Sequence, residues 1–210
     1  MRPLNTLLAS AVLLSSAAFA DTAEARPSVP EILTELSGDG EFDNNPFDYD
    51  MLLKAVVAAS DGDVNVLGAL SSGKFTLFAP NDLGFIRLAQ DLGYTGSDEA
   101  GAFGAIVSFL TTAGEGDPIP LLTDVLLYHV SPERISASRF IRKAIRNKSV
   151  ETLLTGAEIQ PYRLFFLKDA ADGLQDPSLF FPINLFAKDR AVIHTINRVL
   201  IPLTNDQLGL

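Results

Sequence analysis

The sequence contains no cysteine and no tryptophan, and only two of its 210 residues are histidine. Without cysteine, the chain has no thiol nucleophile, no thiolate ligand for a metal ion and no disulfide. The motifs of a serine-hydrolase elbow (GxSxG), a zinc protease (HExxH) and a phosphate-binding loop (GxxxxGK[ST]) are absent as well. We therefore expect a protein that is not an enzyme and that uses no cofactor and no metal ion.

Positive charge is also scarce. Sixteen Lys and Arg residues face twenty-six Asp and Glu residues, which gives a formal net charge of −10. A polyanion repels phosphate overall, so we expect no nucleic-acid partner. The length of 210 residues and the hydrophobic fraction of 47% fit one globular domain and exclude an intrinsically disordered chain.

The first twenty residues have the three parts of a secretory signal peptide. Arg2 is followed by an apolar run that ends near Leu14, and an A-x-A sequence closes at Ala20 before acidic Asp21. The run is too short and too rich in Ser and Ala for a membrane span, which needs about 20 apolar residues. We predict cleavage near Ala20 and a secreted, periplasmic or cell-surface location. An uncleaved N-terminal anchor is the alternative.

In the rest of the chain, the spacing of the apolar residues changes once, from a helical to a strand-like pattern. Residues 21–30 contain two prolines and are predicted to be a linker before a single domain over 31–205. Helical spacing predicts helices over 31–36, 52–57, 64–70, 102–110, 121–127 and 135–146. Shorter runs predict strands over 150–154, 158–160, 163–168, 179–181, 192–195 and 197–201. Helices first and strands last indicate an α+β fold, with helices packed on a small β-sandwich or wedge-shaped sheet.

A strand that leads directly into a helix is predicted around residue 80. Residues 74–79 read as a strand, Pro80 ends it, and Asn81 or Asp82 caps a helix whose buried face starts at Phe85. The sequence from 76 to 85, TLFAPNDLGF, resembles the first signature of the fasciclin domain, T-h-F-A-P-x-[DN]-x-x-F, in which h is apolar.

Two further segments resemble the same family in the same order. The sequence AVIHTINRVLIP (191–202) resembles the second signature, V-I-H-x-I-[DN]-x-V-L-x-P, and LLYHV (126–130) is similar to the central Tyr-His segment. The resemblance covers about residues 28–203 and implies that the two signature segments lie side by side in the folded core. Residues 93–120 and 172–189 are additions to the family pattern, and each is a candidate for shielding or creating a binding surface.

The resemblance implies a non-catalytic role in adhesion or interaction at the cell surface or in the extracellular matrix. In animal members the Tyr-His segment is associated with receptor binding, so Tyr128 and His129 are candidate partner-binding residues. The alternative is that both brace the core, since neighbours on a strand point to opposite faces and at most one is exposed. A binding role requires an exposed ring. The alternative function is an enzyme or small-molecule carrier with a pocket near this segment.

Charge is distributed unevenly along the chain. Six basic residues and no acid fall between 134 and 148, whereas acids crowd residues 39–63 with only Lys54 opposing them. A positive helix on a negative body suits a cell-surface or matrix protein, an anionic polymer or membrane surface, or the acidic region of a second copy. An ordinary solvated helix face is the alternative. The candidate partner-binding residues on this helix are Arg139, Arg142, Lys143 and Arg146, and the residues predicted to face inward are Phe140, Ile141, Ala144 and Ile145.

Two other patterns have simpler explanations. Residues 61–65, DGDVN, imitate the start of a calcium loop, but Val66 stands where the loop needs Gly and Ser72 where it needs Glu, so we predict a solvated turn. Phenylalanines are concentrated in the strand region and are expected to pack between strands rather than to line a ligand pocket. They are Phe165, Phe166, Phe180, Phe181 and Phe186.

Overall fold

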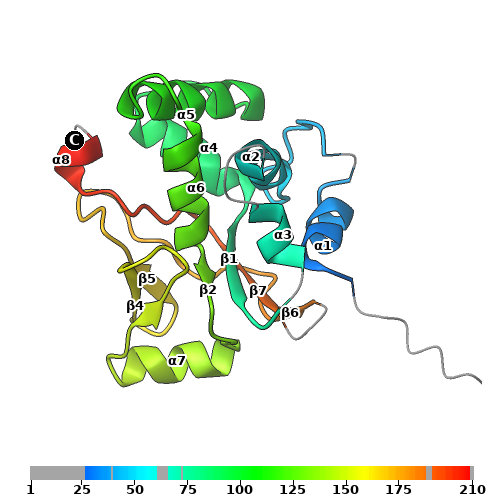
Figure 1. The fold of residues 1–210 in the computed structure, drawn as a ribbon, viewed down its shortest axis with the longest axis vertical. Coiled ribbons are helices and arrows are strands. Elements are labelled where there is room, and N and C mark those ends of the chain that lie inside the picture. Colours follow the sequence, from blue (N-terminus) through cyan, green and yellow to red (C-terminus); the bar gives the residue numbers. More distant parts are fainter. Residues whose placement is uncertain (1–26, 39, 61–65, 72, 188–190, 209–210) are drawn as a thin grey trace, which may run out of the picture.

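In the computed structural model, the described residues (27–38, 40–60, 66–71, 73–187 and 191–208) form an α+β fold (Figure 1), as the sequence predicts. The predicted signal peptide, most of the predicted linker and the calcium-like turn at 61–65 lie outside these residues. Within the described ranges, no helix is both long enough and apolar enough to cross a bilayer.

A four-stranded mixed sheet forms the centre of the molecule, with the strand order β2-β1-β7-β6. Its two central strands are parallel and fully buried, and their register runs from Thr76 opposite Val192 to Pro80 opposite Ile196. The two signature segments therefore lie side by side, which confirms the arrangement that the sequence implies. The strands are β1 (Thr76–Pro80), β2 (Val130–Ser131), β6 (Leu185–Phe186) and β7 (Val192–Ile196).

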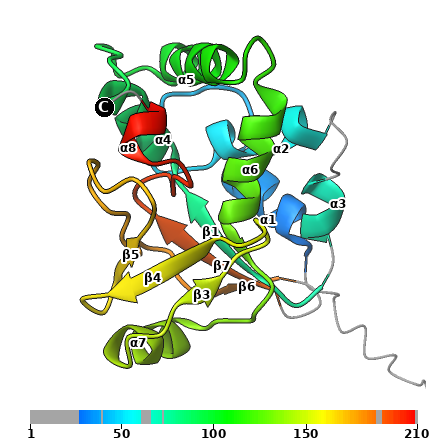
Figure 2. The same cartoon turned by 60° about the vertical axis from the view of Figure 1, so that its left-hand side comes forward.

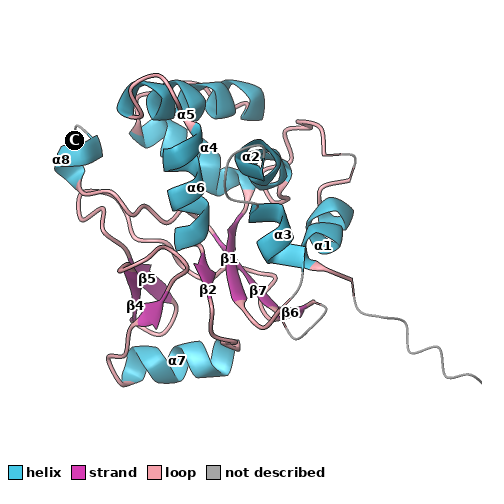
Figure 3. Cartoon of the chain, in the orientation of Figure 1, coloured by secondary structure: helices cyan, strands magenta, loops and turns pink. Residues whose placement is uncertain are grey.

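Seven helices among the described residues surround this sheet, and an eighth lies on a smaller sheet (Figure 3). Helices α1 to α3 lie together beside the sheet, and α4 to α6 cover its other end in Figures 1 and 2. Their buried faces form the larger hydrophobic core with β1 and β7. These seven are α1 (Val29–Leu36), α2 (Asp50–Ser60), α3 (Val66–Ser71), α4 (Asp82–Asp91), α5 (Glu99–Ala113), α6 (Ile119–Tyr128) and α8 (Asn205–Leu208).

The predicted corner between β1 and α4 is present. Asn81 is the N-cap, and its side-chain oxygen accepts a hydrogen bond from the Gly84 amide at 3.2 Å. A Cβ at Gly84 would lie 3.1 Å from the Cα of Arg198, so the absence of a side chain lets α4 approach the segment that follows β7. Phe85 is buried, as expected.

A second, antiparallel sheet and α7 (Ala137–Ile145) form the opposite end of the molecule from α5 (Figure 2). Helix α7 packs on β4, and a second, smaller core including Phe78, Tyr128 and Phe140 connects this sheet to the central one. The strands of this sheet are β3 (Val150–Glu151), β4 (Glu158–Tyr162) and β5 (Phe166–Lys168).

Two of the predicted strands do not form. Leu179 makes a single bridge to Ile196, and residues 197–201 join no ladder. The reason is visible at 200 and 201, where the backbone amides donate to the side chains of His129 and Asp169 instead of to a neighbouring strand.

The expectation that the five phenylalanines pack between strands is wrong for four of them. Phe181 is 80% exposed, and Phe165, Phe180 and Phe186 are also exposed, whereas Phe166 is half-buried. Residues 180–181 join no ladder and Phe186 lies on an edge strand, so these rings do not pack between strands; Phe180 stacks on Phe47, and Arg134 lies over the ring of Phe186.

Candidate functional site

Tyr128 and His129 lie at the C-terminal end of α6, where Tyr128 is the last helical residue and His129 the C-cap. The sequence prediction placed them on a strand, and the strand instead begins at Val130. Both residues are buried, with exposed fractions of 2% and 1%. The Tyr128 hydroxyl donates to the carbonyl of Glu158 at 3.0 Å, which connects α6 to β4.

The His129 ring joins α6 to the second signature segment. Its Nδ1 donates to the carbonyl of Val125 at 2.7 Å, and its Nε2 accepts from the amide of Leu200 at 2.9 Å. The acceptor role of Nε2 fixes the neutral tautomer. Burial lowers the pKa of His129 to about 4, so the ring is uncharged at neutral pH.

His194, in β7, is arranged in the same way. Its Nε2 lies 2.8 Å from the carbonyl of Ile135, and its Nδ1 accepts from the amide of Asn184 at 3.3 Å. The side chain is fully buried, and burial lowers its pKa. Both histidines therefore brace backbone segments. The condition stated above for partner binding, an exposed ring, is met neither by Tyr128 nor by His129.

Helix α7 has the amphipathic form that the sequence predicts, with one exception. Ser136 caps it, and Phe140 is completely buried, while Ile141 and Ala144 are half-buried. Ile145 was expected to face inward but is 69% exposed. It is the last helical residue, and α7 packs mainly on the five-residue strand β4, which covers only a narrow stripe of the helix.

The outer face of α7 carries the basic residues. The structure brings the four candidates together along an open groove of about 290 Å³, which we call the α7 groove. Two of the cations have an acidic neighbour, since Glu133 pairs with Arg139 and, at 3.0 Å, with Lys143. The α7 groove is lined by Arg139, Arg142, Lys143, Arg146, Lys148 and Ser149.

Three cations of the α7 groove are left without such a neighbour. Arg142, Arg146 and Lys148 are exposed, and none of them forms an ion pair with any other described residue. An open cleft of about 440 Å³ adjoins the groove at Lys143 and carries acids, among them Glu151 and Glu158. The positive surface is therefore bounded on one side by negative charge.

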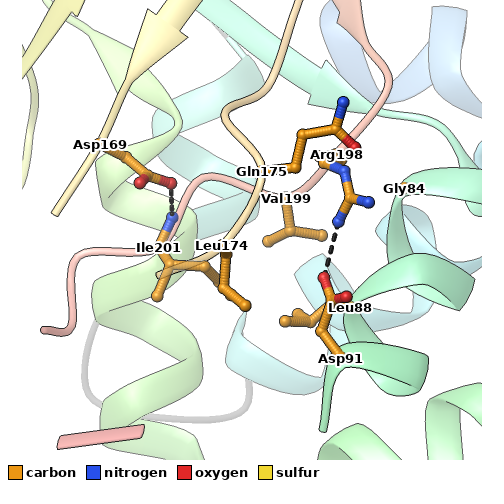
Figure 4. A pocket seen from close by; sticks show the side chains of 9 residues that line it. All are labelled: Gly84, Leu88, Asp91, Asp169, Leu174, Gln175, Arg198, Val199 and Ile201. Atoms are coloured by element: carbon orange, nitrogen blue, oxygen red, sulfur yellow. Dashed lines mark hydrogen bonds and ion pairs between the residues drawn. The ribbon is translucent and has the colours of Figure 1, made fainter. Parts of the chain in front are cut away.

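A pocket beside residues 172–189 is shown in Figure 4. The Arg198 guanidinium contacts the Asp91 carboxylate at 2.6 Å on one side of it. On another side, Asp169 accepts from the Ile201 amide at 2.8 Å, and burial raises the pKa of Asp169 to about 6. Its cavity of about 10 Å³ accommodates about one water molecule, which is too little for a substrate or a carried ligand.

The other addition, residues 93–120, shields the core. It contains the whole of α5, whose residues Ala102, Ile106 and Leu110 are buried against the larger core. A small, partly open apolar pocket of about 40 Å³ lies between α5, α4, α6 and the C-terminal segment. This addition therefore supplies core packing rather than an open binding surface.

A group of acidic side chains, which we call the carboxylate cluster, was not recognised from the sequence beyond the crowding of acids at 39–63. Carboxylate oxygens of Asp48, Asp50 and Asp82 lie within 4.8 Å of one another, as do those of Asp43, Asp48 and Glu99. Burial and neighbouring carboxylates raise the pKa of Asp50 to about 6 and that of Asp82 to about 9. Among the residues that the structure describes, these groups have the ligand chemistry to hold a metal ion.

A comparison with protein-family models agrees with this architecture. The family model described as "Fasciclin domain" matches residues 51–202. Among solved structures, the chain is similar to a FAS1 domain pair from the insect cell adhesion molecule fasciclin I, with 14% sequence identity and a TM-score of 0.47. The alignment covers 87% of this chain and 52% of that one, so this chain spans about half its length. No curated protein matches.

The two parallel central strands, each carrying one of the signatures, define an α+β domain of the fasciclin type. The chain belongs to the fasciclin domain family.

Proposed function

We propose that this chain is an exported adhesion or interaction protein without catalytic activity, which binds an acidic partner through the α7 groove. The partner is a cell-surface or matrix protein or an anionic polymer. The observation that carries the proposal is the group of three exposed cations, Arg142, Arg146 and Lys148, that have no ion-pair partner among the described residues of an acidic chain.

The spacing of these cations supports binding rather than helix stability. Arg142 and Arg146 are one helical turn apart, and like charges at that spacing destabilise a helix by about 0.2–0.5 kcal/mol. Arg142 and Lys143, in the last turn, do interact favourably with the helix dipole, but this interaction does not account for Arg146 and Lys148, which follow the helix. An anion placed in the α7 groove would remove the repulsion and add charge-assisted hydrogen bonds.

Export is supported by the signal-peptide pattern of residues 1–20 and by the adhesion type of the family. The absence of catalytic motifs supports a binding role. The alternative of an enzyme or carrier gains no support from the pocket beside 172–189, which has room for about one water molecule.

Retention of the purified chain on heparin and on immobilised polyglutamate tests the proposal. We expect retention at low salt and release near 1 M salt, where the Debye length is about 3 Å. The triple variant Arg142→Glu, Arg146→Glu and Lys148→Glu should lose retention. The matched control changes three exposed cations outside the α7 groove, Lys74→Glu, Arg163→Glu and Lys168→Glu, and alters the net charge equally.

Equal retention of the two triple variants, or no retention of the unchanged chain at low salt, would reject the α7 groove as the binding surface. Anionic vesicles and analytical ultracentrifugation of the chain alone cover the two other partner classes, a membrane surface and a second copy. Binding restricted to either of these would replace the proposed partner.

A further inference from the structure

We propose that the carboxylate cluster is a binding site for a divalent cation, with Ca²⁺ as the ion that its chemistry fits best. This inference is independent of the α7 groove, because it concerns different residues at a different place in the fold. It also departs from the expectation, based on sequence motifs, that the chain uses no metal ion.

Three segments that are distant in the sequence supply the carboxylates. The loop before α2 supplies Asp43 and Asp48, and α2 begins at Asp50. Asp82 is the first residue of α4, and Glu99 is the first residue of α5. Asp48 belongs to both groups of mutually close oxygens, so it connects Asp50 and Asp82 on one side with Asp43 and Glu99 on the other.

Most of these side chains are hidden from solvent. Asp50, Asp82 and Glu99 have exposed fractions of 0%, and Asp48 has 5%. Asp43 is exposed and provides the side of the cluster that faces solvent. Acidic side chains are rarely buried to this extent unless a charged partner or a metal ion compensates them.

Several buried oxygens have no hydrogen-bond partner. They are both carboxylate oxygens of Asp50, Oδ1 of Asp48 and Oε1 of Glu99. Carboxylate oxygens that are removed from water and left without a donor are strongly unfavourable, so this group of four is the observation that points to a ligand.

The remaining oxygens of Asp48, Asp82 and Glu99 accept hydrogen bonds from amide groups of the chain. Asp48 Oδ2 accepts from the side-chain amide of Asn45 at 2.9 Å, and Glu99 Oε2 accepts from the backbone amide of Asn44 at 2.9 Å. Asp82 uses its two oxygens to accept from the amides of Met51 and Asp50, at 3.1 and 3.2 Å. Hydrogen bonds of this kind orient carboxylates toward a metal ion.

The basic side chain nearest in sequence does not neutralise the cluster. Lys54 forms its ion pair with Glu41, at 3.5 Å, and lies over the ring of Phe42. Among the described residues, no basic side chain forms an ion pair with any of the five carboxylates. The charge must therefore be compensated by bound protons or by a bound cation.

The donor set selects the type of cation. All the available ligands are carboxylate oxygens, which are hard donors, and neither histidine belongs to the cluster. Such a set suits Ca²⁺ or Mg²⁺ rather than zinc or copper. Ca²⁺ takes six to eight oxygens in irregular geometry, whereas Mg²⁺ requires a near-ideal octahedron. Two overlapping groups of three carboxylates, drawn from three segments of backbone, match the first requirement better.

Calorimetric titration of the purified, EDTA-treated chain with CaCl₂ tests the site directly, with thermal unfolding in Ca²⁺ and in EDTA as a second measurement. We expect one bound Ca²⁺ per chain, weaker binding of Mg²⁺, and a higher Tm in Ca²⁺ than in EDTA. Asp50→Asn and Glu99→Gln should each weaken Ca²⁺ binding by at least about tenfold. The exposed Asp124→Asn and the calcium-like-turn variant Asp61→Asn are the controls and should bind as the unchanged chain does.

No heat of binding and no Ca²⁺-dependent change in Tm for the unchanged chain would overturn the proposal and leave protons as the compensating charge. Loss of binding in Asp61→Asn, together with unaltered binding in Asp50→Asn, would move the site to the turn and overturn it as well. The titration of the unchanged chain decides the question even if a variant does not fold.

Discussion

Two regions of the molecule bury polar side chains: the carboxylate cluster, and the surroundings of His129 and His194, which we call the junction. They differ in how those side chains are paired. At the junction, each of the two histidines uses both ring nitrogens in hydrogen bonds to backbone groups, and one bond of each ring reaches a residue more than fifty positions away in the sequence. In the cluster, four buried carboxylate oxygens have no partner at all. Buried groups that are fully paired within the chain are part of the structure, whereas a concentration of unpaired carboxylate oxygens leaves negative charge that a bound cation would compensate.

The largest effect expected from this comparison is at His129. Replacement by Leu keeps a similar volume but leaves the Leu200 amide and the Val125 carbonyl buried without partners. We expect the free energy of unfolding to fall by about 3 kcal/mol, since each unpaired buried group costs about 1–3 kcal/mol. Urea titration at pH 7 measures it. An unchanged midpoint would mean that the junction does not depend on this pairing.

The lowered pKa of His129 also predicts a smaller effect, which is a dependence of the free energy of unfolding on pH. The folded pKa is about 4 and the unfolded value 6.5, so below pH 6.5 the unfolded chain binds a proton that the folded chain excludes. Stability is lost as the pH falls from 6.5 toward 4, by roughly 2 kcal/mol at pH 5.

The His129→Leu variant is the control for this prediction, because it lacks the titrating group. The stability difference between the unchanged chain and the variant should therefore shrink from pH 7 to pH 5. A difference that stays constant over this range would show that the ring at 129 does not titrate as its burial implies.

The smallest expected effect has the opposite sign and lies in the carboxylate cluster. In EDTA at pH 7, Asp50→Asn removes one buried negative charge, and the new amide can donate to neighbouring oxygens such as Asp48 Oδ1. We expect the variant to be more stable than the unchanged chain by about 1 kcal/mol. A loss of stability in EDTA, measured by urea titration, would mean that the Asp50 carboxylate stabilises the fold as the paired histidines do. The two regions would then not differ in the way described above.

Local sequence signals predicted the elements whose causes are local. The Pro80 stop and the Asn81 cap predicted where β1 ends and α4 begins, and helical spacing over 135–146 predicted α7. Resemblance to the family supplied the pairing of the two signature segments, which spacing alone does not reveal.

The predictions that were wrong depend on contacts with residues that are distant in the sequence. Residues 197–201 have the composition of a strand, but their backbone donors are taken by His129 and Asp169, which the local sequence does not show. Ile145 fits the apolar stripe of α7 and is exposed because the sheet beneath the helix is small.

The carboxylate cluster was missed for the same reason. Its acids near residue 48 were visible as local crowding, but the cluster forms only when the first residues of α4 and α5 approach that loop. An acid in the first turn of a helix, such as Asp82 in α4, also has an ordinary local explanation in the sequence.

The parallel pairing of β1 with β7 has a consequence for the order of events in the cell. A ribosome must synthesise nearly the whole domain before the strand that completes the central sheet exists, and such distant pairing slows folding. For the export proposed above, this delay would favour passage through a secretion channel, because a slowly folding chain stays unfolded for longer after synthesis.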